Sequence, residues 1–394
     1  MAVFALLLLM AACATLEPPK EKPREPGVGP MVPWSKVPGW KAGSQAEAWP
    51  ALLATCERLG STPDWRAICD EAELYPNPSD AQARFFMRTR FTPHRMVGGG
   101  DDDRGLITGY YVPLLNGSFE PTERYRYPLY EPPEDLLHIN LGARFVRLAG
   151  ERVRGRLNGN QEVVPYYDRA RIESDAQPLS GNELLWVDNR IDRFFLHIQG
   201  SGRIRLPDGE VVKVGYADQN GRRYVSIGKV LIDRGDLTSE EVSLPAIRSW
   251  LHSHPGRVRP LLNENPSYVF FALRETNLGG PLGSLGVPLT PRRSLAVDPD
   301  HIPLGSPVWM TTKLPAPDHS DEQRPYRRLT FAQDTGGAIN GAVRADLFTG
   351  QGVPGEWLAG RMKDDGRLYL FRPAWKYKPA GTQVAGEPAP DGSG

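Results

Sequence analysis

The chain has 394 residues, 40% hydrophobic and 24% charged, which are ordinary values for a globular protein and enough length for two domains. Lysine plus arginine equals aspartate plus glutamate, at 47 each, and this balance argues against nucleic acid as a partner. Proline and glycine are abundant, at 38 and 41 residues, and favour turn-rich β structure over long helices.

The N-terminus has the pattern of an export signal. Residues 1–13 hold an apolar run too short to span a bilayer, followed by Ala11, Ala12 and Cys13. This pattern is typical of a bacterial lipoprotein signal, which is cut before a cysteine that then carries lipid. A plain secretory signal is the alternative, and both interpretations send the protein out of the cytoplasm.

Two segments near the ends of the chain lack the signs of a packed fold. Residues 14–44 are rich in proline and charge and have no apolar period, so we expect a tether between a lipid anchor and a folded domain. Residues 377–394 have the composition of a disordered tail.

Three helices are predicted after the tether, because apolar residues recur there at helical spacing next to capping residues and glycine. They cover residues 45–60, 61–75 and 79–91. The second is expected to begin at a Ser61 or Thr62 cap with Pro63 in its first turn. An even pair of cysteines in an exported protein suggests a disulfide, so Cys56 and Cys69 would join the first two helices; two buried free thiols are the alternative.

From about residue 107 onward, apolar residues recur at every second position. Short runs of β-branched and aromatic residues alternate with Gly, Pro or Asn, which is typical of strands. These runs cover residues 106–115, 193–202, 210–217, 267–275, 306–312, 327–334 and 367–373. Two helical pieces interrupt them within residues 224–255, broken at Gly235 and restarted at a Thr238 or Ser239 cap with Glu241 behind it.

Common metal, nucleotide and serine-nucleophile motifs are absent from the sequence, including HExxH, paired CxxC, the Walker A loop and GxSxG. His252 and His254 follow a predicted helix end and precede a proline, which favours a solvated loop over a metal site. We therefore expect no metal and no cofactor. If the protein is an enzyme, its acid–base groups are carboxylates.

Two acids, Asp334 and Asp346, bracket a stretch built otherwise from small and apolar residues. If residues 342–348 form a strand, Asp346 shares a face with Arg344. Partial burial would raise the pKa of Asp346 and let it donate a proton, provided that Arg344 points away or pairs elsewhere. A structural carboxylate is the alternative, and for Asp334 a turn carboxylate that accepts backbone N–H groups is the stronger interpretation.

Two other stretches have the composition of a carbohydrate site. One combines amide and hydroxyl groups with glycines that let a ligand approach the backbone. The other places adjacent tyrosines on opposite faces of a strand, so that one can stack on a sugar while the other fills the core. The residues are Gln199, Ser201 and Gly202 in the first stretch and Thr108, Tyr110 and Tyr111 in the second. Turn chemistry and core packing explain each stretch alone about equally well.

Taken together, several stretches resemble one known family. The sequence contains, in order, GYYVPLL, RYPLYEPPEDL, FFLHIQGSGRI, VGYADQNGRRYVSIGKVLIDRG, NPSYVFFALRE, AVDPDHIPLGSPVWM and QDTGGAINGAVRADLFTG. Over about residues 45–375 this order is similar to that of the membrane-bound lytic transglycosylase A family. The C-terminal part also resembles the wider three-aspartate domain, whose acids fall here on Asp298, Asp334 and Asp346.

The resemblance implies a mainly β fold with N-terminal helices. A double-psi β-barrel would be assembled from residues 45–112 and 263–376, and a second β-barrel domain would be inserted at residues 113–262. A groove between the two would hold a peptidoglycan glycan strand. Residues lining it would include Thr108, Tyr110, Tyr111, Gln199, Ser201 and Gly202, with Asp334 and Asp298 orienting loops and neighbouring donors.

The resemblance also implies the reaction. Family members cleave the β-1,4 bond between N-acetylmuramic acid and N-acetylglucosamine without water and leave a 1,6-anhydro end, and the single catalytic aspartate falls on Asp346. We expect a periplasmic enzyme anchored to the outer membrane through lipid on Cys13, with glycan strands and other cell-wall enzymes as partners. A glycoside hydrolase that uses Asp346 with a second acid, or a non-catalytic glycan-binding module, is the alternative.

Overall fold

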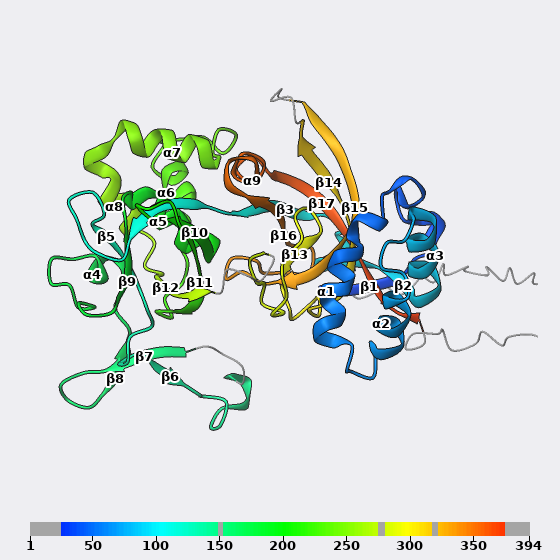
Figure 1. Cartoon of the computed structure of the whole chain (residues 1–394), viewed down its shortest axis with the longest axis horizontal. Helices are drawn as coiled ribbons and strands as arrows, with labels where there is room; N and C mark the ends of the chain where they lie inside the picture. The colour runs from blue at the N-terminus through cyan, green and yellow to red at the C-terminus, as the bar shows by residue number, and fades with distance from the viewer. Residues whose placement is uncertain (1–24, 149–152, 275–279, 317–321, 375–394) are drawn as a thin grey trace, which may run out of the picture.

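The computed structural model describes residues 25–148, 153–274, 280–316 and 322–374, which form two bodies side by side along the long axis of the molecule (Figure 1). The signal segment with Cys13 and the tail predicted at residues 377–394 lie outside these ranges. Within them, no helix combines the length and the apolar character that crossing a bilayer requires. The fold is mostly β with helices at its margins, as the sequence predicts.

The first body is built on an eight-stranded sheet that closes on itself. Its order is β1-β2-β17-β14-β15-β13-β16-β3, and a further pairing of β17 with β3 joins six of the strands into a ring. The strands are β1 Gly27–Met31, β2 Phe91–Val97, β3 Gly105–Val112, β13 Ser294–Val297, β14 Pro307–Pro315, β15 Gln323–Asp334, β16 Ala345–Gln351 and β17 Lys363–Pro373. Ile107, Leu295, Val308, Leu347 and Leu368 belong to its buried core.

Three helices cover one end of this ring, at the right of Figure 1. They are α1 Trp49–Leu59, α2 Arg66–Glu73 and α3 Asp80–Arg90, so the three predicted helices are confirmed. The second begins at Arg66, later than the expected Ser61 or Thr62 cap, because residues 62–65 form a turn first. Cys56 and Cys69 form the expected disulfide between α1 and α2, with their Cα atoms 5.4 Å apart.

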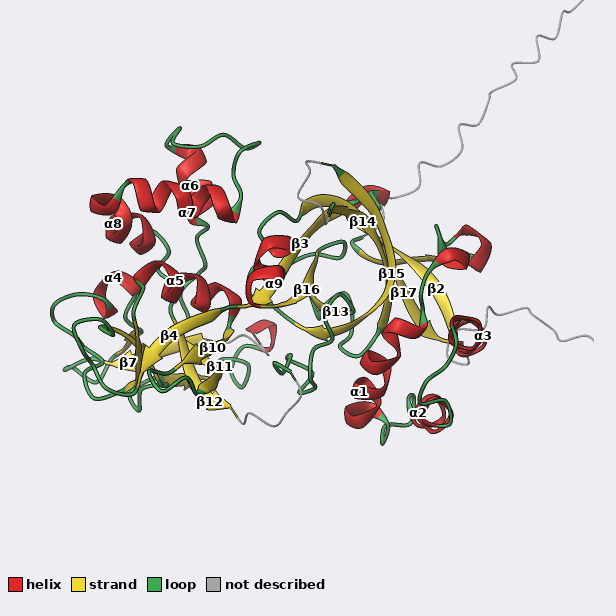
Figure 2. Ribbon diagram, turned by 45° about the horizontal axis from the view of Figure 1, so that its top comes forward, coloured by secondary structure: helices red, strands yellow, loops and turns green. Residues whose placement is uncertain are grey.

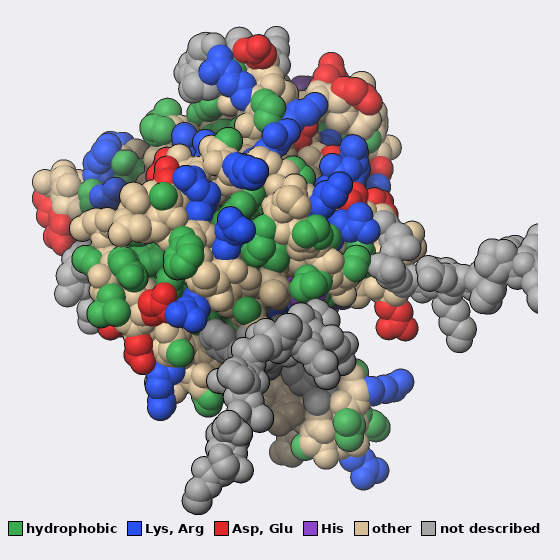
Figure 3. Space-filling view, turned by 90° about the vertical axis from the view of Figure 1, so that its right-hand side faces the viewer, with side chains coloured by type: hydrophobic (Ala, Val, Ile, Leu, Met, Phe, Trp, Pro, Cys, Tyr) green, Lys and Arg blue, Asp and Glu red, His purple; other side chains and the backbone are tan. Residues whose placement is uncertain are grey.

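The expected tether at residues 14–44 is wrong over its described part. β1 pairs antiparallel with β2, and Trp34 and Trp40 pack on the barrel. The Trp34 ring lies 4.9 Å from that of Phe371, and the Trp40 ring lies 5.0 Å from that of Trp309. Two isolated tryptophans anchor this segment without an apolar period, which is why its composition resembles a linker. Figure 3 views this end of the molecule, where Lys and Arg side chains are interspersed with hydrophobic ones.

The second body is inserted between β3 and β13. It contains a six-stranded sheet in the order β12-β11-β10-β4-β9-β5 and a separate three-stranded sheet in the order β6-β7-β8. The strands are β4 Leu114–Ser118, β5 Tyr127–Tyr130, β6 Leu137–Ile139, β7 Val153–Leu157, β8 Val163–Pro165, β9 Glu183–Val187, β10 Ser201–Arg205, β11 Val211–Gln219 and β12 Val269–Arg274. The inserted domain therefore extends to Arg274, beyond the expected boundary at residue 262, because β12 pairs with β11.

Helices of the inserted domain gather on one side of its larger sheet (Figure 2). They are α4 Arg169–Ile172, α5 Arg190–Gln199, α6 Ile227–Asp233, α7 Leu244–Ser253 and α8 Val258–Asn263. A capping box forms at Thr238 and Glu241, as expected, but only a turn follows it. A helix from there cannot pass Pro245, which lacks an N–H, so α7 starts instead at a Ser243 cap with Pro245 in its first turn.

The strand predicted at residues 193–202 is wrong in type, because most of this segment is helix α5. Asn189 caps the helix by accepting from the backbone N–H groups of Ile191 and Asp192, and Gly200 ends it with a left-handed φ of 74°. The apolar residues of this short segment bury themselves at helical spacing in two neighbouring clusters. A short continuous apolar run is compatible with both the helical period of 3.6 residues and the strand period of two. Here the Asn189 cap and the C-terminal Gly200 favour the helix.

β3 runs directly into β4 and so connects the two bodies. Two side-chain contacts join the bodies near this connection. Gln199, at the end of α5, accepts from the backbone N–H of Tyr111 in β3 at 2.9 Å. Arg248 of α7 forms an ion pair at 3.2 Å with Glu356 of α9, the barrel helix Gly352–Ala359.

Candidate active site

Strand register brings the predicted acids and β3 side chains to one face of the barrel. β16 and β3 are parallel neighbours, with Asp346 opposite Thr108 and Phe348 opposite Tyr110. Residues two apart on a strand share a face, so all four side chains project the same way. On the other side of β16, Asp346 lies opposite Ala296 of β13, and Ala296 in turn lies opposite Asp334 of β15.

Asp346 is half-buried and receives one hydrogen bond from the described residues. The Thr108 hydroxyl donates to its Oδ1 at 2.7 Å. Arg344 donates from Nη2 to the same hydroxyl oxygen at 2.8 Å. A guanidinium can only donate, so the Thr108 proton is free to point at Asp346. When Asp346 is protonated, its proton therefore lies on Oδ2, the oxygen that Thr108 does not reach.

Burial raises the pKa of Asp346 from 3.8 to about 6. The Arg344 charge and the Thr108 hydrogen bond act in the opposite direction and lower this pKa, while the nearby charge of Asp334 raises it further. A carboxyl group in this range is partly protonated near neutral pH, which is the condition for a general acid. Arg344 does not turn away from Asp346, but it pairs elsewhere, which the sequence prediction allowed. It donates to the backbone oxygens of Leu106 and Ala345 and to the Thr108 hydroxyl.

Asp334 is also half-buried, but its carboxylate is saturated with donors. Its Oδ2 accepts from the Tyr110 hydroxyl at 2.8 Å. Its Oδ1 accepts from the backbone N–H and hydroxyl of Ser284 and from the backbone N–H of Thr335, each at 2.9 Å. Burial raises the pKa of Asp334 and these hydrogen bonds lower it. Asp334 therefore fixes Tyr110 and two loops in place, close to the turn role expected for it.

Apolar side chains pack beside the acid cluster formed by Asp346, Thr108, Asp334 and Tyr110. The Tyr110 and Phe348 rings lie 5.4 Å apart, and both are buried with Val112, Leu289 and Ile339. Burial and the adjacent Asp334 raise the pKa of the Tyr110 hydroxyl well above 10, so this phenol stays protonated and donates. Tyr110 is consequently a wall and a hydrogen-bond donor to Asp334 rather than an open stacking platform for a sugar.

Two other predicted site residues hold elements together instead of facing the cluster. Tyr111 is 1% exposed and points to the opposite side of β3, near Arg248 and Glu356. Gln199 uses its side-chain oxygen to bind the backbone of β3. Both residues therefore fix the inserted domain to the strand that carries Thr108 and Tyr110.

The remaining predicted residues lie apart from Asp346 in the strand pairings and hydrogen bonds of the described chain. Ser201 and Gly202 lie on β10 in the other sheet. A Cβ at Gly202 would meet the end of the Leu196 side chain at 2.4 Å, so this glycine gives helix α5 room to pack on β10. Asp298 accepts from the backbone N–H of Gly341 at 2.6 Å and so positions the loop that leads to Asp346.

The sequence analysis does not identify Ser284 and Thr335, which bind the Asp334 carboxylate. Ser284 lies in a loop rich in glycine and proline, where a single serine carries no recognisable signal. The described residues contain no group of three or more His, Cys, Asp or Glu side chains arranged to hold a metal ion. The chemistry that this cluster can perform is proton transfer by one carboxyl group beside a wall of aromatic and small residues.

Comparison with known proteins gives a consistent result. The MltA specific insert domain matches residues 106–272, and the 3D domain matches residues 293–372. Membrane-bound lytic murein transglycosylase A of Vibrio cholerae is 34% identical over 277 residues, which are 69% of this chain and 67% of that protein. The chain belongs to the membrane-bound lytic murein transglycosylase A family. The resemblance seen in the sequence is thereby confirmed.

Solved structures of the lytic murein transglycosylase A family share this fold. The membrane-bound lytic murein transglycosylase from Agrobacterium tumefaciens superposes with a TM-score of 0.77 at 30% identity, covering 89% of this chain and 100% of that one. The E. coli family member with bound chitohexaose superposes with a TM-score of 0.68 at 25% identity, covering 89% and 95%. By family membership the chain is an enzyme of the lytic transglycosylase class.

Proposed function

We propose that the chain cleaves the β-1,4 bond between N-acetylmuramic acid and N-acetylglucosamine in peptidoglycan without water, leaving a 1,6-anhydro end, and that Asp346 is its one catalytic acid and base. The observation that carries the proposal is the state of this carboxyl group. It is half-buried, its pKa is raised to about 6, and its Oδ2 is left without a hydrogen bond from the described residues. Family relatives named as murein transglycosylases support the choice of substrate.

Asp346 would act twice in one turnover. As the C1–O bond breaks, its Oδ2 proton passes to the glycosidic oxygen, which leaves with the bonding electron pair. The 6-hydroxyl oxygen of the same muramyl residue then forms a bond to C1. Its proton passes to the Asp346 carboxylate, so the acid is regenerated and no water is consumed. Between the two transfers the carboxylate stabilises the positive charge at C1.

A hydrolase mechanism would need a second free carboxyl group to activate water. The nearest acid along the strand pairings is Asp334, which lies two strands from Asp346 with Ala296 between them. Its two oxygens already accept four hydrogen bonds, from Tyr110, Ser284 and Thr335. A base with saturated lone pairs is poorly suited to take a proton from water, and this favours the internal 6-hydroxyl as nucleophile.

We also propose the finer architecture that accompanies this reaction. The six-stranded ring would be a double-psi β-barrel, the inserted domain a second β-barrel, and the glycan would bind in a groove between them that includes Thr108 and Asp346. The E. coli relative binds chitohexaose, an oligosaccharide, which supports a site of this extended kind. Gln199 and Tyr111 would keep the groove walls in register.

Product analysis tests the proposed reaction. Purified peptidoglycan is incubated with the enzyme, and the released fragments are analysed by mass spectrometry. The proposal predicts anhydro ends, which are 18 Da lighter than the reducing ends that a hydrolase produces. Reducing ends would identify a hydrolase, and the absence of any release would leave a glycan-binding module.

We further propose that lipid on Cys13 anchors the enzyme to the outer membrane from the periplasmic side. The family name and the cysteine that follows the apolar segment support this placement. Replacing Cys13 with Ser should release an active enzyme into the soluble periplasmic fraction, because Cys13 precedes every residue of the candidate site. Wild-type protein found in that soluble fraction would contradict the proposal.

A further inference from the structure

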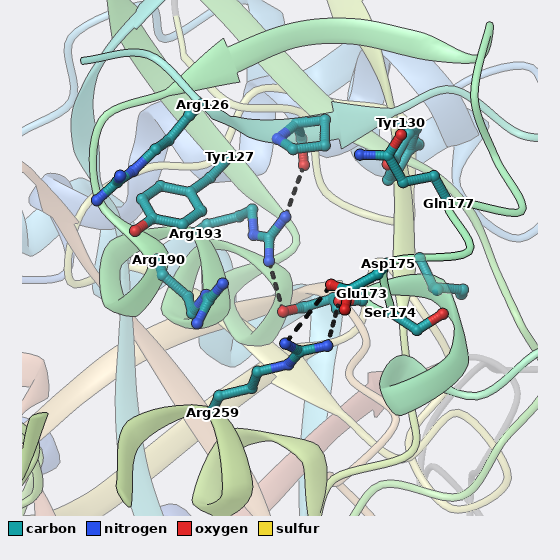
Figure 4. Close-up of a pocket in the computed structure, with 12 residues that line it drawn as sticks. Arg126, Tyr127, Tyr130, Glu173, Ser174, Asp175, Gln177, Arg190, Arg193 and Arg259 are labelled. Carbon is teal, nitrogen blue, oxygen red and sulfur yellow. Dashed lines mark hydrogen bonds and ion pairs between the residues drawn. The ribbon is translucent and has the colours of Figure 1, made fainter. Parts of the chain in front are cut away.

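A pocket of about 430 Å³ lies entirely within the inserted domain (Figure 4). β5, the segment after α4, the first turn of α5 and helix α8 supply its wall. None of the residues that surround Asp346 takes part. Four arginines and two acids line it: Arg126, Arg190, Arg193, Arg259, Glu173 and Asp175.

Three of the arginines surround one aromatic ring. The guanidinium carbons of Arg126, Arg190 and Arg193 lie 5.3, 5.1 and 5.7 Å from the centre of the Tyr127 ring. Arg193 is paired with Glu173 at 2.7 Å. Among the described residues, Arg126 and Arg190 donate no hydrogen bond and lie within ion-pair distance of no acid, although the charge of Arg190 lowers the pKa of Glu173. The Nε of Arg190 is buried, but Arg126 is exposed and Arg190 is half-buried, so their terminal N–H groups are available to a ligand in the pocket.

The buried charges in and directly behind this wall also have an excess of positive charge. Arg169 and Arg193 both pair with Glu173, and all three side chains are at most 5% exposed, so two buried cations share one anion. His197 contacts Arg169 and stays neutral, because burial and the two arginines hold its pKa well below its usual range. Asp175, fully exposed, already has Arg259 at 3.9 Å. An anion entering from solvent would restore the balance.

The chemistry of the pocket lining favours carboxylates carried on a peptide. Guanidinium forks match planar carboxylates in a bidentate manner. Tyr127, Tyr130 and Ile172 add apolar surface, and Gln177 adds an amide, which suit a peptide better than an isolated ion. Helix α5 leads from Arg190 to Gln199 beside β3, about 14 Å at 1.5 Å per residue. An extended peptide of four or five residues spans roughly that distance.

We infer that this pocket binds the carboxylates of the acidic peptide carried by the peptidoglycan strand while the glycan occupies the groove. The inference rests on the proposed function. It gives the inserted domain a role in selecting strands that still carry their peptides. The peptide would dock on Arg126 and Arg190, whose donors are free, while Arg193 and Arg259 shape the wall.

Calorimetry on the full chain tests the inference with three probes: a soluble peptidoglycan disaccharide with its peptide, the same disaccharide without the peptide, and inorganic phosphate. We expect the peptide to improve affinity at least about tenfold. The double variant Arg126→Gln/Arg190→Gln should lose that gain. The matched variant Arg58→Gln/Arg171→Gln, which removes two exposed arginines that do not line the pocket, should retain it.

Three outcomes would overturn the inference: no gain from the peptide, a gain unchanged in the pocket variant, or phosphate binding more tightly than the peptide at the same arginines, which would indicate a site for small free anions. Turnover of purified peptidoglycan tests the proposed function separately, and peptidoglycan left uncleaved by the wild type would defeat that function. If the pocket variant cleaves peptide-free glycan strands at the wild-type rate and has lost the peptide gain, the pocket is a site separate from the chemistry.

Discussion

Asp346 and Asp334 lie on either side of the same small residue, Ala296, on two strands that flank β13. Their backbones are two strand spacings apart, about 10 Å, and a larger residue at position 296 would project between the two carboxyl groups. The arrangement couples the acids, because the charge of Asp334 raises the pKa of Asp346. Their surroundings differ, however, since from the residues that the structure describes Asp334 accepts four hydrogen bonds and Asp346 accepts one.

This difference predicts unequal effects of removing each acid. Asp346→Asn keeps the shape of the side chain and can still accept from Thr108, but it cannot exchange a proton. We expect release of anhydro fragments to fall at least about 10²-fold, the low end of what one acid–base group contributes. Binding of a glycan oligosaccharide should persist, and calorimetry with that oligosaccharide measures it.

Asp334→Asn is the matched control. Its amide nitrogen would face donors at a site where the carboxylate accepts on both oxygens, so we expect a lower melting temperature and a smaller loss of turnover. Near-wild-type turnover by Asp346→Asn, together with a folded but inactive Asp334→Asn, would mean that the two roles are assigned the wrong way round.

The pH dependence of turnover follows from the same carboxyl group. The acid form of Asp346 must be present at the start of the reaction, and its pKa is about 6. Turnover should therefore decline as the pH rises through that value, toward a tenfold loss per pH unit. Arg344 lowers this pKa, so Arg344→Gln should move the decline to higher pH. Initial rates between pH 4 and 9 measure the shift.

Arg361→Gln serves as the control for this experiment. Arg361 is an exposed arginine of the same body that contacts Trp357 and not the acid cluster. It should leave the position of the decline unchanged. A decline that moves to lower pH in Arg344→Gln would contradict the assignment of the titrating group to Asp346.

Much of the barrel is predictable from the sequence. The strands that contain Tyr110 and Asp334 have regular alternation and clear breaks, and the helix that starts after Ser79 carries a capping box with Gln82. Helix α5 is not predictable from its continuous apolar run, because such a run is compatible with the spacing of a helix and with that of a buried strand. The strand at residues 27–31 is also hidden, since its stability comes from pairing with β2 and from distant tryptophans.

The two acids and the β3 side chains of the candidate site are predictable from the sequence, but the contacts between them are not. Asp346 and Thr108 are 238 positions apart, and only the parallel pairing of β16 with β3 brings them within 2.7 Å. The direction of Arg344 depends on that pairing as well. Gln199 has a suitable chemical type for a ligand group, yet the helix end places its oxygen against β3. Residue type thus indicates chemistry, while register decides which residues can perform it.

Thr108 is expected to position Asp346 without taking part in proton transfer. Thr108→Val keeps the volume but removes the donor to Asp346 and leaves Arg344 without its hydroxyl acceptor. We expect a loss of turnover of about tenfold. The Thr108 hydrogen bond lowers the pKa of Asp346, so its removal should raise that pKa and move the decline of turnover to higher pH. Thr108→Ser restores the hydroxyl and should restore both properties.

The pH profile separates this role from a purely structural one. Damage to the fold would reduce turnover equally at every pH and would not be repaired by serine specifically. If Thr108→Val keeps the wild-type profile and loses only stability, Thr108 has a structural role and does not position Asp346.

Stability should depend on pH through Asp346 in the opposite sense to an ordinary surface aspartate. The folded protein holds this proton with a pKa of about 6, while an unfolded chain releases it near pH 4. Between these values the folded state binds more protons, so the free energy of unfolding falls as the pH rises from about 4 to 6 and stays lower above that range. The ionised carboxylate thus destabilises the fold where the enzyme would be less active.

Asp346→Asn removes this penalty because an amide does not ionise. We expect the variant to be more stable than the wild type at pH 8 by about 1 kcal/mol. A pKa shift of about two units corresponds to about 3 kcal/mol for a fully buried group. Asp346 is only half-buried, so solvent screening reduces this value. The difference should shrink toward zero at pH 4, where the wild-type group is protonated in the folded state. Urea unfolding of both proteins at the two pH values measures it. A wild type more stable than the variant at pH 8 would show that the folded site favours the charged form, and Asp346 would then be poorly suited to start the reaction as an acid.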